Sequence, residues 1–235
     1  MRLYKVKALF KLGMEDLLKN LNVFIYVILP IAFAFLYANM GNTPKEYLFS
    51  ICTLLTLSMV PVALMGTIIA EEKEKNTLRT LMLNDVKASE ILFAKAMICM
   101  LFVVIDNLLI YFILELPMDH FILYQLVAFI TGLAIILFGA IVGLLAKNQM
   151  SAGLLSMPFM IIFMAPMFIM MFKDKLAETI SSLLPTDAMM EIFSCITKNT
   201  LTIAKIGFPC FVIIAWLVIS ILLFQFAYKK VGVDN

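Results

Sequence analysis

Long apolar runs separated by short polar stretches dominate the chain. A helix rises about 1.5 Å per residue, so a hydrocarbon core about 30 Å thick needs roughly 20 apolar residues. Six runs are long enough, at approximately 21–39, 47–70, 92–114, 121–146, 151–172 and 207–228. The pattern predicts an all-α, polytopic membrane protein with six transmembrane helices. Because little polar sequence remains for a soluble domain, we treat residues 1–235 as a single transmembrane domain.

The composition supports this prediction. Hydrophobic residues make up 63% of the 235 residues, charged residues make up 14%, and the mean hydropathy is +1.04. Ordinary globular domains are roughly 45–50% apolar and about 25% charged. The formal net charge of +2 is too small to indicate a nucleic-acid partner.

Lysine and arginine are distributed unevenly between the two sides that six spans would define. Five of the 18 basic residues fall on one side, namely Lys45, Lys173, Lys175, Lys198 and Lys205. The other thirteen fall on the side that holds both termini and the segment between the second and third runs. Since cytoplasmic loops carry the excess of Lys and Arg, both termini and that segment are expected in the cytoplasm.

Residues 1–20 carry a helical pattern of their own. At about 100° per residue, the apolar residues share one narrow face opposite the charged ones, and they are Leu3, Val6, Phe10, Met14, Leu17 and Leu21. This pattern predicts an amphipathic helix in the cytoplasmic interface, with its basic residues toward anionic lipid head groups. The alternative is the start of a long first span.

The segment 173–206 is too polar to span a bilayer. Apolar residues recur at helical spacing on both sides of Pro185, which predicts two short outer helices that cap the bundle or dip into the outer leaflet. Cys195 and Cys210 both fall toward this side. They either form a disulfide or remain buried apolar thiols.

Enzymatic chemistry is hard to find in the sequence. There is one histidine, His120, and there is no HExxH, GxSxG or phosphate-binding GxxxxGK[ST] motif. The four cysteines show no metal-ligand spacing. We therefore expect a chain with no catalytic residue, no metal site and no cofactor of its own.

Asp106 is the one acidic residue deep within a predicted span. An ionised carboxylate is costly there, so it should face the protein interior, pair with a cation or stay protonated. Its role is either coupling to a proton or substrate, or a structural hydrogen bond to a neighbouring helix.

Two periodic patterns occur within the apolar runs. Gly139 and Gly143 have the GxxxG spacing that lets two membrane helices approach closely, and Gly66 and Ala70 repeat this spacing of small residues. In the fifth run, methionines at steps of three and four form one stripe, namely Met157, Met160, Met164, Met167 and Met171. Flexible methionines suit a surface that accepts varied apolar shapes, and ordinary bundle packing is the alternative.

A charged segment, EEKEKNTLRTLMLNDVKASEILFAK, runs from Glu71 to Lys95 between two apolar runs. It resembles the first cytoplasmic loop of type-2 ABC transporter permeases, where a charged cluster precedes a Thr-Leu step, a leucine pair, a turn and an Ile-Leu-x-x-Lys return to the membrane. The resemblance depends on Glu72, Glu74, Thr77, Leu78, Leu81, Ile91, Leu92 and Lys95. Asn76 stands where the family usually has Gly, and Asp85-Val86 where it often has Pro-Val.

This resemblance implies that residues 71–91 form a coupling helix that docks on a separate ATP-binding subunit, which holds the ATP and Mg²⁺. An amphipathic helix in a groove can transmit rigid-body motion to the spans on either side. The docking residues that the resemblance implies are Glu72, Glu74, Thr77, Leu78, Arg79, Leu81, Met82 and Leu83. The alternative is a solvated loop that only fixes topology.

The resemblance further implies a homodimeric permease in the plasma membrane of a bacterium. It would export an amphipathic or hydrophobic substrate such as a peptide, bacteriocin or drug, and so confer antimicrobial resistance. The family places the pathway between protomers near the second and fifth spans, which makes Met160, Met164 and Met167, with Phe163 at their flank, the candidate lining. Asp106 is a separate candidate, for a pathway that runs past the third span. The alternative function is a non-transporting immunity or scaffold protein that acts by binding alone.

Overall fold

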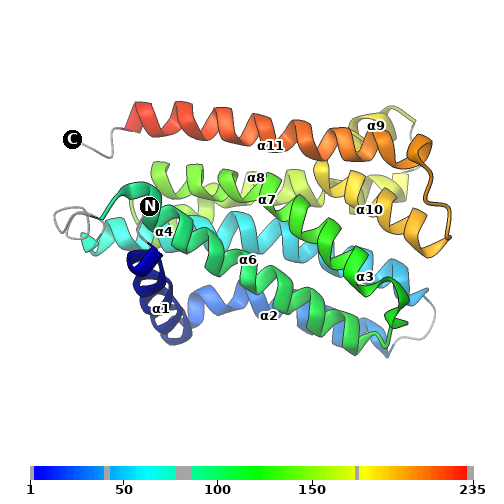
Figure 1. Ribbon diagram of the computed structural model, residues 1–235, viewed down its shortest axis with the longest axis horizontal. Coiled ribbons are helices and arrows are strands. Elements are labelled where there is room, and N and C mark those ends of the chain that lie inside the picture. The colour runs from blue at the N-terminus through cyan, green and yellow to red at the C-terminus, as the bar shows by residue number, and fades with distance from the viewer. Residues whose placement is uncertain (1–2, 40–42, 78–85, 173–174, 232–235) are drawn as a thin grey trace.

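The computed structural model describes residues 3–39, 43–77, 86–172 and 175–231, and every regular element in these ranges is helical. Figure 1 shows the helices side by side along one long axis. Their bounds are α1 Leu3–Lys19, α2 Leu21–Ala38, α3 Lys45–Met59, the π-helical turn η1 Val60–Leu64, α4 Met65–Glu74, α6 Ala88–Ile113, the 3-10 turn η2 Met118–His120, α7 Phe121–Leu145, α8 Gln149–Phe172, α9 Lys175–Ser181, α10 Pro185–Thr197 and α11 Ile203–Val231.

Five helical stretches in the described residues are long and apolar enough to cross a membrane. They are Lys45–Glu74, Ser89–Ile113, Met118–Leu145, Gln149–Ile169 and Ile203–Lys230. The first of the six predicted runs corresponds to α2, whose apolar part, Phe24–Ala38, is shorter. The structure thus confirms an all-α, multi-pass membrane protein.

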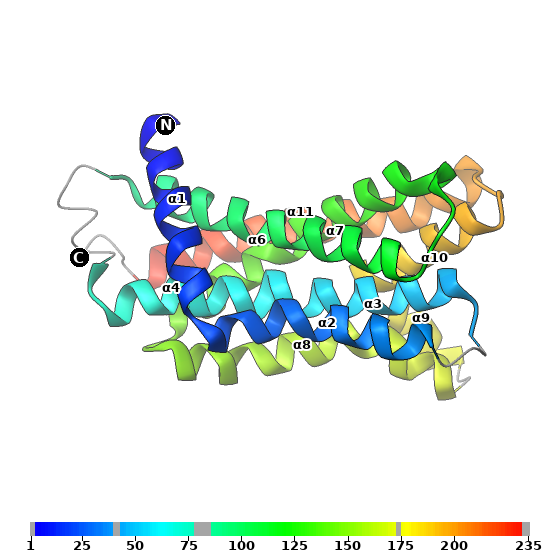
Figure 2. The same cartoon turned by 90° about the horizontal axis from the view of Figure 1, so that it is seen from below.

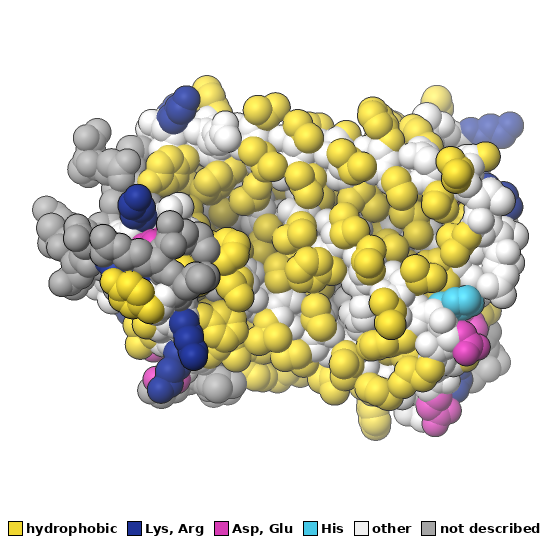
Figure 3. Space-filling model, in the orientation of Figure 1, with side chains coloured by type: hydrophobic (Ala, Val, Ile, Leu, Met, Phe, Trp, Pro, Cys, Tyr) yellow, Lys and Arg dark blue, Asp and Glu magenta, His cyan; other side chains and the backbone are white. Residues whose placement is uncertain are grey.

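On the face shown in Figure 3, the charged side chains lie at the two ends of the bundle. Figure 3 shows an apolar band across the middle of one face, with basic and acidic side chains at either end. We call the end where α4 stops and α6 begins the loop end; α1 and the last turns of α11 also lie there (Figures 1 and 2). The opposite end carries α9 and α10.

At the loop end, α1 crosses the long axis of the bundle (Figures 1 and 2). Its apolar face packs on the first turns of α6, where Val6 and Leu9 are buried against Ile91 and Ala94. The apolar face expected in residues 1–20 is therefore occupied partly by α6.

The continuous stretch α3–η1–α4 is the centre of the molecule. Its most apolar window is completely buried, because α2, α6, α7, α8 and α10 pack around it. Pro61 lies in η1 and has no N–H to donate to the preceding turn, which favours a local departure from α-helical hydrogen bonding. The second predicted span is thus enclosed within one protomer.

Small residues make this enclosure possible. A Cβ added to Gly139 would lie 2.7 Å from the Val62 carbonyl oxygen and closer still to that of Pro61. A Cβ added to Gly143 would lie 2.9 Å from the Gly66 carbonyl oxygen. The two small-residue patterns of the sequence therefore pack against each other within one chain.

Aromatic rings hold the opposite end together. Phe49 of α3 contacts Tyr111 of α6, Tyr124 of α7 and Phe193 of α10, with ring centroids 5.3, 5.3 and 5.5 Å apart. Two short helices, α9 and α10, lie before the last span, as expected for this segment, and Pro185 is the first residue of α10. The last span, α11, begins at Ile203, four residues earlier than the apolar run. Cys195 is buried, Cys210 is exposed, and both are free thiols.

We expect Gly139→Ala to lower stability by more than the roughly 1–3 kcal/mol typical of overpacking, because the added methyl group meets backbone rather than a flexible side chain. Gly207→Ala is the matched control, since nothing lies within 4 Å of its added Cβ. That helical substitution should be neutral or stabilising by up to about 1 kcal/mol. Thermal unfolding in detergent measures both, and equal midpoints would contradict the close packing of α7 on η1.

Candidate functional site

The last turn of α4 carries four consecutive charged residues, Glu71, Glu72, Lys73 and Glu74. Because successive residues of a helix point about 100° apart, four in a row project in different directions. At the loop end α4 is surrounded by other helices, so each side chain meets a different part of the bundle.

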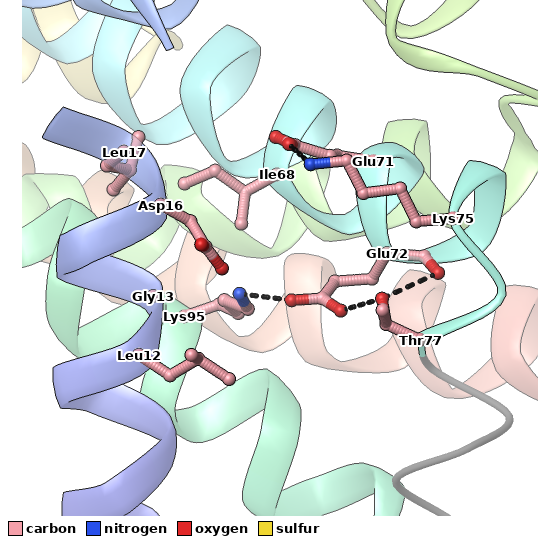
Figure 4. Close-up of a pocket in the computed structure, with 10 residues that line it drawn as sticks. All are labelled: Leu12, Gly13, Asp16, Leu17, Ile68, Glu71, Glu72, Lys75, Thr77 and Lys95. Carbon is pink, nitrogen blue, oxygen red and sulfur yellow. Dashed lines mark hydrogen bonds and ion pairs between the residues drawn. The ribbon is translucent and has the colours of Figure 1, made fainter. Parts of the chain in front are cut away.

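Glu72 points toward α6 and forms a buried ion pair. Its carboxylate lies 2.5 Å from Lys95 Nζ, and the two side chains are 11% and 5% exposed. The Thr77 hydroxyl donates to the same carboxylate and lies 3.1 Å from the Glu72 carbonyl oxygen (Figure 4). Lys95 follows the segment 78–85 and Thr77 precedes it. The pair therefore ties the two sides of this segment together.

Glu71 points toward the junction of α1 and α2. Asn20 Nδ2 donates to Glu71 at 3.2 Å and lies 3.3 Å from Gln149 Oε1 of α8. Lys75 pairs with the same carboxylate, whose hydrogen bond raises the pKa of the Lys75 ammonium. Glu71 thus joins α4 to the start of α2 and, through Asn20, to α8.

Lys73 and Glu74 contact the turn between α7 and α8. Lys73 Nζ lies 2.6 Å from the Leu144 carbonyl oxygen and 2.7 Å from that of Ala146. The Glu74 carboxylate accepts the Gln149 N–H at 3.1 Å. A cation therefore meets the last carbonyls of α7, and an anion meets the first N–H groups of α8.

Two hollows adjoin this turn of α4. One, of about 180 Å³, lies between α1, α4 and α6, and its lining includes Leu12, Asp16, Ile68, Glu72 and Lys95 (Figure 4). The other is an open groove of about 660 Å³ between α2, α4 and α8. Its lining includes Tyr26, Thr67, Glu74, Gln149, Met157 and Met160. The second hollow is large enough for a substrate-sized molecule.

Residues 30–226 match the family model described as ABC-2 family transporter protein. The chain belongs to this family. No curated protein matches its sequence. The match covers most of the chain, including every membrane-spanning stretch but the last residues of α11.

Family membership makes the chain a membrane subunit of an ABC transporter, and it implies a separate ATP-binding subunit. The resemblance inferred from the loop sequence is thereby confirmed. The match begins within α2, so α1 lies outside it.

The predicted docking residues of this ABC-2 chain divide into two groups. Leu78, Arg79, Leu81, Met82 and Leu83 lie outside the described residues. Glu72, Glu74 and Thr77 are described, and all three bond within the chain. Their docking role stays a prediction, and their observed bonds join the end of α4 to α6 and α8.

The predicted pathway residues are not gathered at one surface. Met160 lines the open groove, whereas Met164 and Met167 are half-buried against the core. Phe163 is 1% exposed and packs between Phe138 and Trp216, with ring centroids 5.6 and 5.7 Å apart. Their part in transport stays a prediction.

Asp106 and its neighbour Asn107 are completely buried. Neither side chain has a hydrogen-bond partner among the described residues. Asp106 thus faces the protein interior, as the cost of a lipid-facing carboxylate requires.

The sequence did not predict that Lys73, Asn20 and Gln149 belong to this site. Nothing in their local sequence distinguishes them, since they lie in polar segments where side chains are commonly solvated. Lys95 did carry a signal, because a lone lysine among apolar residues needs a buried partner.

Lys95→Met should destabilise the chain by about 3–5 kcal/mol, because it leaves the Glu72 carboxylate buried and unpaired. Unfolding in detergent measures the loss, and Glu72→Met with Lys95→Met should recover most of it. Lys45→Met is the control, since the Lys45–Glu115 pair is exposed and should contribute about 0–1 kcal/mol. If Lys95→Met and Lys45→Met lowered the free energy of unfolding equally, burial would not strengthen the Glu72–Lys95 pair.

Proposed function

We propose that this chain is the permease subunit of an ATP-driven exporter that moves an amphipathic or hydrophobic substrate out of the cell. The observation that carries the proposal is the bonding of residues on either side of the segment 78–85, where Thr77 and Lys95 both contact Glu72. Because a buried ion pair joins the end of α4 to α6, a force applied at this end of the bundle passes to both helices.

The ATP-binding subunit docks on residues 71–91 in this proposal. Leu78, Leu81, Met82 and Leu83 supply apolar contacts, and Arg79 pairs with an acidic group of the partner. Glu72, Glu74 and Thr77 hold the docking helix in place. ATP and Mg²⁺ are bound by the partner, and the permease binds no cofactor itself.

The topology we propose has six spans, with α2 as the first. Its 18 residues rise about 27 Å, close to the hydrocarbon thickness of about 30 Å. It packs along α3 and α6, which both span. The loop end, with most of the basic residues, faces the cytoplasm, as the positive-inside rule requires for a plasma-membrane protein. Both termini are then cytoplasmic, and a bacterial source fits the family.

In this orientation α1 lies in the cytoplasmic interface. It crosses the bundle axis (Figure 2), and its face opposite α6 exposes Lys7 and Lys11. These ammonium groups are placed to contact anionic lipid head groups.

A second copy of the chain completes the transporter in our proposal. Apart from α11, α8 is the least buried of the long spans, and Leu154, Ile161, Ile162 and Phe168 are exposed on it. Pairing along α8 places the open groove and Met160 beside the partner. Met164, Met167, Phe163 and Asp106 remain pathway residues in this proposal. The mainly apolar lining fits peptides, bacteriocins or drugs, and export of these gives resistance.

Cysteines placed at Lys45 and Lys198 should react with an impermeant maleimide added outside intact cells, and cysteines at Lys75 and Lys147 should not. The background carries Cys210→Ser, because that native thiol is exposed. Permeabilised cells provide the control that the inner positions react at all. Labelling of Lys75→Cys in intact cells would overturn the proposed orientation.

Leu81→Asp should release the ATP-binding subunit while the permease stays in the membrane, because a charge enters an apolar groove without a partner at a cost of about 1–3 kcal/mol or more. Co-purification of the two subunits measures this. Leu201→Asp, at an exposed leucine of the opposite end, is the matched control and should leave the complex intact. Wild-type recovery of the complex with Leu81→Asp would disprove this placement of the contact.

A further inference from the structure

Lys73 and Glu74, at the end of α4, bond to the two helix ends that flank the turn between α7 and α8. Lys73 Nζ donates to the Leu144 and Ala146 carbonyl oxygens at 2.6 and 2.7 Å. Glu74 Oε2 accepts the Gln149 N–H at 3.1 Å. We call these two side chains the turn clamp.

The signs of the turn clamp match the helix dipoles. A helix carries roughly half a negative charge at its C-terminus and half a positive charge at its N-terminus. Lys73 meets the C-terminus of α7 and Glu74 the N-terminus of α8, so each interaction is charge-assisted. Exchange of the two charges would make both contacts repulsive.

Hydrogen bonds within the turn between α7 and α8 join it to the first residues of α8, so the turn clamp acts on the start of α8 as a unit. The N–H groups of Lys147 and Asn148 donate to Ser151 Oγ at 2.9 and 3.0 Å, and Ser151 N–H donates to Asn148 Oδ1 at 2.8 Å. These bonds satisfy groups that a helix N-terminus leaves free. A force on Gln149 therefore moves the first turns of α8 together.

The groove of about 660 Å³ lies directly beside this clamp. Glu74 and Gln149 line its end, and Met157 and Met160 of α8 line its side. Across it stands Tyr26 of α2, and a Cβ added to Gly153 would meet only the Tyr26 hydroxyl, at 3.5 Å. α8 packs mainly on α3, η1 and α4, and the Asn20–Gln149 hydrogen bond joins its first turn to the start of α2. The width of the groove therefore depends on how α8 sits on the central stretch α3–η1–α4.

We propose that Lys73 and Glu74 are positioning residues that convert displacement of the end of α4 into movement of α8, and so set the width of this groove. The inference rests on the proposed function, because the displacement comes from the ATP-binding subunit. The opposite side of α4 is held to α6 by Glu72 and Lys95, so a displacement of this turn also reaches α6.

The test uses a reporter cysteine at Met157, which lines the groove and is 53% exposed, in the Cys210→Ser background. Its maleimide labelling rate is measured in the complex with the ATP-binding subunit, without nucleotide and with MgATP plus vanadate. With the clamp intact, the two rates should differ several-fold. With Glu74→Ala or Lys73→Met they should become equal in the purified complex.

Matched variants distinguish a positioning role of Lys73 and Glu74 from the effect of removing a charge and from a failure to fold. Lys75→Met removes a lysine that pairs with Glu71 in its own helix, and it should keep the wild-type difference. Lys73→Arg retains the charge and two donors and should restore the response. Should Lys73→Met fail to fold, Glu74→Ala decides, because Glu74 is exposed.

Each result bears on a different statement. A nucleotide response that persists in Glu74→Ala overturns the clamp. A complex that forms but shows no response in the unaltered chain overturns it as well and leaves the proposed function standing. Failure of the unaltered chain to bind the ATP-binding subunit overturns the proposed function and this inference together.

Discussion

The enclosure of α3–η1–α4 is the constraint on which the rest of the structure depends. A helix buried on all sides in a membrane protein gains nothing from the hydrophobic effect relative to lipid, so close packing must hold it. Gly139 and Gly143 supply that packing by letting α7 approach the carbonyl groups of η1 and α4. The other helices then take positions around this pair, and α8 and α11 are left with the most exposed faces.

The same enclosure explains the charges at the end of α4. Where the central helix leaves the apolar region, its neighbours are still close, so charged side chains meet protein rather than water alone. The Glu72–Lys95 pair is buried, whereas Glu71, Lys73 and Glu74 form charge-assisted bonds at its margin. One turn of helix thereby connects α6, α7, α8 and the start of α2. A displacement of this turn is shared among all of them.

The interior also holds polar groups that this packing leaves without partners. Asp106 and Asn107 of α6 and Thr53 and Thr56 of α3 are buried, and their side-chain polar atoms lack hydrogen bonds among the described residues. Such groups are costly in a low-dielectric interior.

The sequence by itself determined the fold class, the membrane-spanning runs, the uneven basic residues and the family, because run length, hydropathy and the loop motif are local properties of the chain. It also marked Gly66, Gly139 and Gly143 as packing residues. Only the tertiary structure decided which surfaces these residues meet. It paired the glycines within one chain, placed Phe163 in an aromatic cluster, and turned Lys73 and Glu74 toward the α7–α8 turn. Local sequence does not encode such choices, because the partner of a side chain depends on helices that are distant in the chain and adjacent only after packing.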